Sequence, residues 1–130
     1  MIGLLIVSHS AKIAEGTKEL AEQMTRGEVP IAAAGGTDDG SLGTSADLIR
    51  AAADRLVARG AEALLVLVDL GSAVMSAEIA LEDFHQPYRL SNGPLVEGAL
   101  MAAVEASIGA NLAQVAAVAE QTKDLLKVHD

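Results

Sequence analysis

The chain has 130 residues, 51% of them apolar, and its 9 basic and 18 acidic side chains leave a formal net charge of −9. The apolar fraction excludes intrinsic disorder, and the acidic balance argues against binding to nucleic acid, whose phosphates need clustered Lys and Arg. The absence of cysteine excludes disulfides, thiolate catalysis and cysteine zinc sites, and it fits a cytoplasmic location. We expect one domain over residues 1–130 and no membrane partner, since no run approaches the roughly 20 apolar residues of a membrane span.

The first half of the chain alternates predicted strands with a predicted helix. The apolar run at residues 2–7 is typical of a strand buried on both faces, and a second short strand is predicted at residues 29–34. The helix between them ends at Arg26 and Gly27, and its helical repeat is carried by Ile13, Thr17, Leu20, Ala21 and Met24. Residues 35–45 then form a glycine-rich loop.

A second helix is predicted after this loop. Thr44, with Asp47 three positions later, resembles a capping box at the start of the helix, and Gly60 ends it. Its inward face is expected to consist of Leu48, Ile49, Ala52 and Leu56.

The second half of the chain repeats the alternation. Strands are predicted at residues 63–68 and, more briefly, at residues 88–90, and the helix between them has Met75 and Ile79 on one face. Two more helices follow, the second of them capped by Asn111. Their apolar positions are Leu95, Ala99, Ala102, Ala103 and Ala106 in the first, and Leu112, Val115, Ala119, Thr122 and Leu126 in the second.

Strands that alternate with helices predict an α/β fold, here a doubly wound, mainly parallel four-stranded sheet with helices on both faces. Right-handed crossovers place the carboxyl ends of parallel strands at one edge, where ligands bind in such sheets. Polar residues follow each predicted strand at that edge: Ser8-His9-Ser10, Gly35-Gly36-Thr37, Asp69-Leu70-Gly71-Ser72 and Ser91-Asn92-Gly93. We therefore expect a binding or catalytic site there.

His9 directly follows the first strand and stands at the start of a helix. The positive end of a helix favours the neutral imidazole, and the free amides of a first helical turn can hold an anion. A neutral imidazole beside anion-binding amides suits a residue that accepts a phosphoryl group. The alternative is a histidine that only caps or packs at this position.

Asp69 ends the third strand, which in doubly wound sheets often lies beside the first. Its carboxylate is therefore expected to reach a ring nitrogen of His9, to fix the tautomer and to stabilise positive charge as the other nitrogen attacks. An N-cap for the helix that starts near Gly71 is the alternative role, and the two roles can coexist.

The remaining sequence signals are weaker. Glycine-rich loops offer amides to phosphate oxygens, but they are also ordinary turns. The chain has no P-loop lysine motif, no dinucleotide-binding glycine spacing after the first strand and no nucleophile elbow. His85 and His129 lack metal-ligand spacing to His9 and are interpreted as surface residues, so no metal site is predicted.

Four segments carry a resemblance that covers nearly the whole chain: Val7–Ser10, Ala34–Ser45, Asp69–Met75 and Pro94–Ala99. In these segments the chain resembles the phosphoryl-carrier subunit of phosphoenolpyruvate-dependent dihydroxyacetone kinases (DhaM type), which is related to the mannose-class enzyme IIA domains of the bacterial sugar phosphotransferase system. Gly71-Ser72-Ala73 favours the dihydroxyacetone branch, because sugar-specific domains usually have a double glycine followed by Ser or Thr and Pro. Ser76 and Gly93 depart from that branch, where Asn and Ala are common.

The resemblance implies that His9 is transiently phosphorylated, on Nε2, and that Asp69 supports it. It also implies that the phosphoryl group is bound by Ser10, Gly36, Thr37, Gly71 and Ser72. The implied donor is the phosphocarrier protein HPr, and the implied acceptor is ADP on the nucleotide-binding subunit of the kinase. No cofactor is expected on this chain, since ADP or ATP and magnesium belong to that partner subunit. A homodimer is also implied.

Three alternatives stay open at this point. A sugar-transporter enzyme IIA domain would use the same chemistry and pass the phosphoryl group to an enzyme IIB domain. A metal chelatase-like α/β domain would use His9 to grip a metal, and it needs a second ligand and a tetrapyrrole-sized cleft nearby. A non-catalytic binding module becomes attractive only if His9 is inaccessible.

Overall fold

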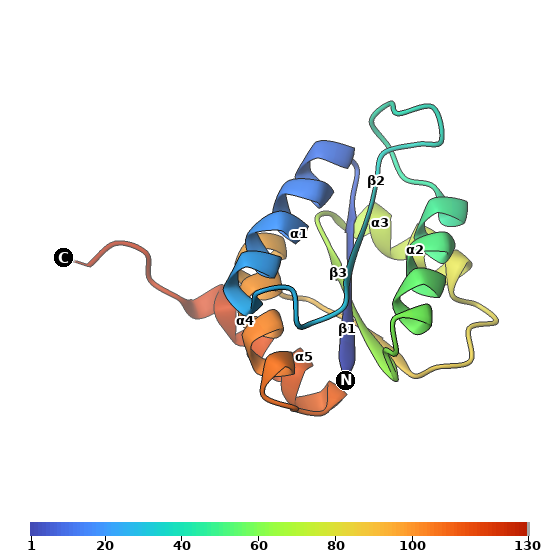
Figure 1. Ribbon diagram of the computed structural model, residues 1–130. Helices are drawn as coiled ribbons and strands as arrows, with labels where there is room; N and C mark the ends of the chain where they lie inside the picture. Colours follow the sequence, from blue (N-terminus) through green and yellow to red (C-terminus); the bar gives the residue numbers. More distant parts are fainter. Residues whose placement is uncertain (130) are drawn as a thin grey trace.

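The computed structural model describes residues 1–129 and contains a parallel sheet between two layers of helices (Figure 1). The elements follow the chain in the order β1 (Ile2–Ser8), α1 (Ala11–Thr25), β2 (Ile31–Gly35), α2 (Ala46–Ala58), β3 (Ala63–Val68), α3 (Gly71–Ala80), β4 (Tyr88–Leu90), α4 (Leu95–Ser107), α5 (Leu112–Gln121) and the short 3-10 helix η1 (Thr122–Asp124). Within residues 1–129, no helix combines the length and the apolar character needed to cross a membrane.

The strands of the sheet lie in the order β2-β1-β3-β4, and each neighbouring pair is parallel. Val7 of β1 lies beside Ala34 on one side and beside Val68 on the other. The chain therefore places β2 on one side of β1 and then crosses over to place β3 on the other side. The order of the strands reverses at this point, and in such sheets ligands bind in the crevice beyond the carboxyl ends of the strands on either side of it. The predicted fold class is confirmed.

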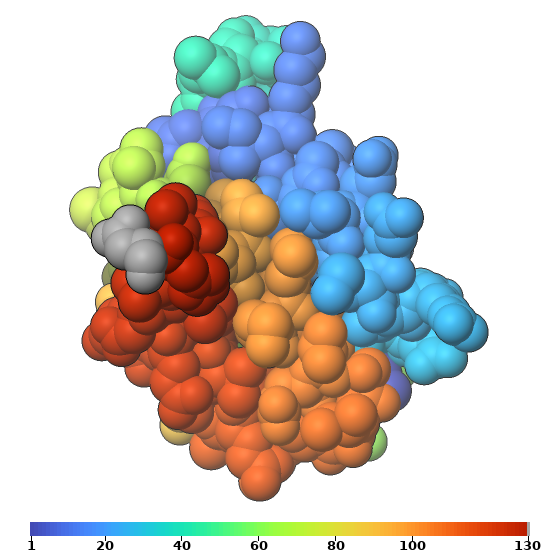
Figure 2. Space-filling model, turned by 90° about the vertical axis from the view of Figure 1, so that its left-hand side faces the viewer, coloured from blue at the N-terminus to red at the C-terminus, as the bar shows by residue number. Residues whose placement is uncertain are grey.

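Helices α1, α4 and α5 cover one face of the sheet, and α2 and α3 cover the other (Figure 1). Figure 2 shows the first of these layers from outside, with α1, α4 and α5 side by side. The side chains of β1 alternate between the two cores, since Leu4 and Ile6 enter the first and Leu5 and Val7 the second. The helices contribute mostly alanine, so they lie close to the sheet.

The predicted strands at residues 63–68 and 88–90 match β3 and β4, whereas the other two shift slightly. β1 extends to Ser8, one residue beyond its apolar run. β2 begins at Ile31 and not at Val29, because Pro30 has no N–H to donate to a neighbouring strand. Pro30 still contributes its carbonyl oxygen, which accepts from Leu4 N at 2.9 Å.

The sequence pattern predicted α1 and part of its buried side, since Thr17 and Ala21 of the predicted repeat are buried. Ile13, Leu20 and Met24 are about half exposed, while the buried residues of the helix are Ala14, Thr17, Ala21 and Thr25. The same difference occurs in α3, where Met75 and Ile79 are exposed and Ala73, Ala77 and Ala80 are buried. In both helices, small residues allow close approach to the sheet and the larger apolar residues lie to one side.

The start of α2 also corrects a prediction. The N-cap is Ser45, whose hydroxyl accepts from Leu48 N at 3.2 Å, and Thr44 instead bonds to Ser76 with 2.6 Å between the two hydroxyl oxygens. Thr44 and Ser45 both carry a hydroxyl that can cap a helix, so the sequence alone does not decide between them. The predicted cap of α5 is confirmed, because Asn111 and Gln114 form a reciprocal capping box.

Gly35 lies where the end of β2 passes close to the start of α1. A Cβ atom at this position would lie 2.4 Å from the Ser10 carbonyl oxygen, and this backbone atom cannot swing aside as a flexible side chain can. We expect Gly35→Ala to lower the free energy of unfolding by about 1–3 kcal/mol, measured by urea denaturation.

A matched control for this substitution is Gly16→Ala in α1. Gly16 has open space around its Cβ position, and its helical backbone suits alanine. We expect Gly16→Ala to raise the free energy of unfolding by about 0.5–1 kcal/mol, because alanine is the better helix former. Equal effects of the two substitutions would contradict the close approach at Gly35.

Candidate functional site

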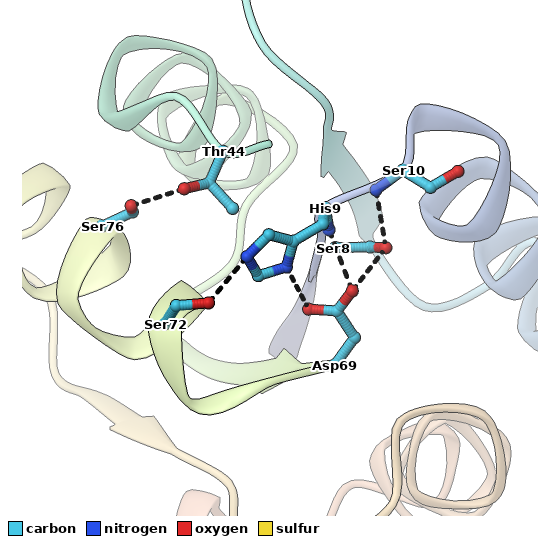
Figure 3. Close-up of polar contacts among 7 residues, drawn as sticks. All are labelled: Ser8, His9, Ser10, Thr44, Asp69, Ser72 and Ser76. Carbon is cyan, nitrogen blue, oxygen red and sulfur yellow. Dashed lines mark hydrogen bonds and ion pairs between the residues drawn. The ribbon is translucent and has the colours of Figure 1, made fainter. Parts of the chain in front are cut away.

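The fold brings His9 and Asp69 together at the carboxyl edge of the sheet (Figure 3). His9 lies between β1 and α1, and Asp69 directly follows β3. Because Val7 pairs with Val68, the next residues of the two parallel strands leave the sheet side by side. The side chain of His9 is 26% exposed and that of Asp69 is 16% exposed, so the imidazole is reachable from solvent while its partner is more enclosed.

Three donors surround the carboxylate of Asp69. Oδ1 lies 3.0 Å from Nδ1 of His9, and Oδ2 accepts from the backbone N of His9 and from Oγ of Ser8, both at 2.9 Å. Burial alone raises the pKa of Asp69, but the hydrogen bonds from His9 and Ser8 outweigh it and hold that pKa below its ordinary value. Asp69 is therefore ionised at neutral pH.

The ionised carboxylate determines which nitrogen of His9 carries the proton. A carboxylate only accepts hydrogen bonds, so Nδ1 must donate to Oδ1. In the neutral imidazole, Nε2 is then left with a free lone pair. Oγ of Ser72 lies 2.7 Å from Nε2, and its hydroxyl donates to that lone pair. The arrangement leaves a basic, nucleophilic nitrogen at the start of α3.

The first turn of α3 lies beside Nε2, since Ser72 contacts this nitrogen. Gly71 and Ser72 are its first two residues, and no side chain caps this helix within the described part of the chain. The amides at a helix start lack partners inside the helix and favour an anion. The alternative role of Asp69 as the cap of this helix is wrong, because its carboxylate bonds to His9 and Ser8 instead.

The other three predicted phosphate-binding residues lie near His9, but their donors are used within the protein. The amide of Ser10 donates to Ser8 Oγ at 3.0 Å, and its hydroxyl caps α1 and points away from the imidazole (Figure 3). The amide of Gly36 donates to the Ser8 carbonyl oxygen at 3.2 Å. Thr37 donates its amide to the Ser41 carbonyl oxygen at 2.9 Å and its hydroxyl to Asp39 at 2.6 Å.

Residues 36–45 project beyond the sheet edge as a loop that is organised around Asp39 (Figure 1). Hydrogen bonds from Ser41 and Thr37 to the Asp39 carboxylate lower its pKa to about 2. The loop is held against the site at its far end, where Gly43 N donates to the His9 carbonyl oxygen at 2.8 Å and Thr44 bonds to Ser76 of α3. These contacts link the loop to the backbone of His9 and to α3.

Ser8 was predicted to lie at this edge of the sheet, but the sequence assigned it no role in the site. Its side chain is fully buried at the end of an otherwise apolar strand, and its hydroxyl contacts the Asp69 carboxylate. A hydroxyl at the end of a buried strand requires a hydrogen-bond partner, and this was the available signal. In the described part of the chain, no three His, Cys, Asp or Glu side chains gather as metal ligands would.

Comparison with known proteins places this site in a family. Residues 3–116 match the family model EIIA-man, described as PTS system fructose IIA component. The chain is 41% identical over 113 residues to the phosphoryl donor subunit DhaM of PEP-dependent dihydroxyacetone kinase 2 from Listeria innocua. This match covers 83% of this chain and 88% of the relative.

Two further similarities differ in how much of the relative they cover. The phosphoryl donor subunit DhaM of the PEP-dependent dihydroxyacetone kinase from Escherichia coli K12 is 42% identical over 122 residues, covering 88% of this chain but 25% of that longer protein. The crystal structure of the unknown-function protein EF1359 superposes with a TM-score of 0.79 at 38% identity, covering 92% of this chain and 93% of that one.

Proposed function

The chain belongs to the EIIA-man family of PTS system fructose IIA components, and we propose that it relays a phosphoryl group through His9 to a dihydroxyacetone kinase. The relatives described as DhaM phosphoryl donor subunits support this assignment, since one of them matches over most of its own length. In this proposal HPr supplies the phosphoryl group, and ADP bound on the nucleotide-binding kinase subunit receives it.

The observation that carries the proposal is the state of the His9 ring, with Nδ1 held by Asp69 and Nε2 presented at the start of α3. The lone pair of Nε2 attacks the phosphorus of phosphorylated HPr, a bond from Nε2 to phosphorus forms, and the bond to the HPr nitrogen breaks with its electron pair. In the second step, a terminal oxygen of ADP attacks the phosphorus and the Nε2–phosphorus bond breaks. No proton has to leave Nδ1 in either step.

Each neighbour of the ring has a distinct part in this chemistry. Phosphorylation of Nε2 leaves positive charge on a ring whose Nδ1–H faces the Asp69 carboxylate, which stabilises that charge. The transferring group carries negative charge on its equatorial oxygens. In the proposal these oxygens are bound by the amides of Gly71 and Ser72 at the start of α3 and by the Ser72 hydroxyl, which turns from Nε2 to the phosphoryl group.

The surface around His9 suits transient protein partners. Ser72, Met75 and Ile79 share one side of α3, and the last two are about two-thirds exposed. Leu42 of the loop and Leu70 at the start of α3 are also largely exposed. Exposed apolar side chains that gather beside a reactive group mark an interaction site, and the net charge of −9 favours partners with a basic surface.

The proposal also includes the cofactor and the oligomeric state of the chain. We expect no cofactor on this chain, because the nucleotide and magnesium belong to the acceptor subunit. We also expect the chain to work as a homodimer, as the family resemblance implies.

The acceptor distinguishes this function from that of a sugar-transporter enzyme IIA domain. The chain would be phosphorylated with labelled phosphoenolpyruvate, enzyme I and HPr, freed of these proteins, and mixed with either acceptor. We expect the label to pass to ADP on the nucleotide-binding kinase subunit and not to an enzyme IIB domain. Controls without the chain exclude direct transfer from HPr. Transfer to enzyme IIB alone would contradict the proposed acceptor.

A further inference from the structure

Ser8 connects the carboxylate of Asp69 to the start of α1. The Ser8 hydroxyl lies 2.9 Å from Oδ2 of Asp69 and 3.0 Å from the backbone N of Ser10. The Ser10 amide is a donor, so Ser8 Oγ accepts from it, and the single hydroxyl proton of Ser8 is available for Asp69. Both bonds are shielded from solvent at the Ser8 end, because the side chain of Ser8 is fully buried.

This connection fixes the plane of the Asp69 carboxylate. Oδ2 is held by Ser8 Oγ and by the backbone N of His9, so the second oxygen, Oδ1, is directed at His9 Nδ1. We propose that Ser8 is a positioning residue, which orients Asp69 and thereby maintains the Nδ1–H tautomer that leaves Nε2 free. Its effect on phosphoryl transfer rests on the proposed function, whereas its effect on the tautomer does not.

A purely structural role for Ser8 would be to satisfy the Ser10 amide. Ser91, which directly follows β4, provides a matched comparison for that role, because its buried hydroxyl accepts from the amide of Gly93, two residues later, at the same 3.0 Å. Among the described residues, Ser91 has no hydrogen bond to Asp69 or His9. The two serines therefore share the local turn and differ in the contact with the carboxylate.

The test compares Ser8→Ala with Ser91→Ala in two measurements. The first is the tautomer of His9 in the unphosphorylated protein, read from the nitrogen chemical shifts of its imidazole. The second is the rate of phosphorylation by phosphorylated HPr. We expect Ser8→Ala to give a mixture of tautomers and to slow transfer by about 10-fold or more, as loss of a supporting hydrogen bond does at other sites. We expect Ser91→Ala to keep the wild-type tautomer, because Ser91 has no hydrogen bond to Asp69 or His9 among the described residues.

The outcomes separate this proposal from the proposed function. A Ser8→Ala variant with the wild-type tautomer and rate would show that the hydroxyl only satisfies an amide, which overturns the proposal. If Ser8→Ala changed the tautomer of His9 but phosphorylated HPr did not phosphorylate even the wild-type chain, the positioning role of Ser8 would stand and the proposed relay would be rejected. If Ser8→Ala does not fold, Ser8→Cys is the second variant, since a thiol of similar volume donates weakly and is expected to change both readouts in the same direction.

Discussion

We expect His9→Gln to abolish phosphorylation of this chain by phosphoenolpyruvate, enzyme I and HPr. Glutamine keeps a polar side chain of similar reach, but its amide nitrogen has no free lone pair to attack phosphorus, whereas Nε2 of His9 does. The expected effect is complete loss of the adduct and not a slower rate. Intact-protein mass spectrometry under conditions that preserve phosphohistidine measures it directly.

The matched control for this experiment is His85→Gln. His85 is an exposed histidine between α3 and β4, so it is more accessible to solvent than His9 and has none of the hydrogen bonds that hold His9. We expect this variant to gain one phosphoryl group, as the wild type does. If the adduct persisted in His9→Gln and disappeared in His85→Gln, the phosphorylated residue would be His85, and the role proposed for His9 would be wrong.

The second large effect is expected from Asp69→Asn. The asparagine amide can donate a hydrogen bond to Nδ1, which favours the tautomer with its proton on Nε2 and removes the nucleophilic lone pair. The substitution also removes the negative charge that stabilises the phosphorylated ring. A change of this kind costs about 10⁴-fold in Ser-His-Asp triads, and we expect at least about 100-fold slower transfer here.

Asp69→Ala is the informative comparison, because alanine removes the charge without imposing a tautomer. We expect its transfer rate to lie between those of the wild type and Asp69→Asn, measured by rapid-quench single-turnover kinetics with phosphorylated HPr. Urea denaturation of both variants shows whether the fold is retained. Wild-type kinetics in Asp69→Asn would reject the orienting role, and a faster rate for asparagine than for alanine would reject the tautomer argument.

The contact between His9 and Asp69 was predictable because it depends on topology. Apolar runs identified β1 and β3, and parallel strands with right-handed crossovers bring their carboxyl ends to one edge. His9 and Asp69, which follow these two adjacent strands, are therefore neighbours, and this does not depend on how the side chains of the core pack. The exact contact, Nδ1 to Oδ1 at 3.0 Å, follows from the register in which Val7 pairs with Val68.

The hydrogen bonds of the loops were not predictable in the same way. Gly36 and Thr37 have the composition of a phosphate-binding loop, but the amide of Gly36 continues the pairing of β2 with β1 by bonding to Ser8. The amide of Thr37 bonds to Ser41, because the loop folds around the carboxylate of Asp39. Which donors remain free depends on turn geometry that no periodicity records. Only Thr17 and Ala21 of the buried side of α1 were predicted, since alanine and threonine give a weaker apolar signal than leucine or methionine.

The two positions that depart from the dihydroxyacetone branch have local explanations. A Cβ on Gly93 would lie 2.4 Å from the Ala119 carbonyl oxygen, so the close approach of α5 requires glycine here. Ser76 bonds to Thr44 and so joins α3 to the glycine-rich loop. Neither residue contacts the imidazole of His9, so neither departure alters the chemistry proposed for it.

The most direct test of this account is to locate the phosphoryl group on the protein. The nitrogen-15-labelled chain would be phosphorylated through HPr, and long-range proton–nitrogen NMR would identify the substituted ring nitrogen. We expect phosphate on Nε2 of His9, with the proton on Nδ1 facing Asp69. Phosphate on Nδ1, on another residue, or on none would contradict it.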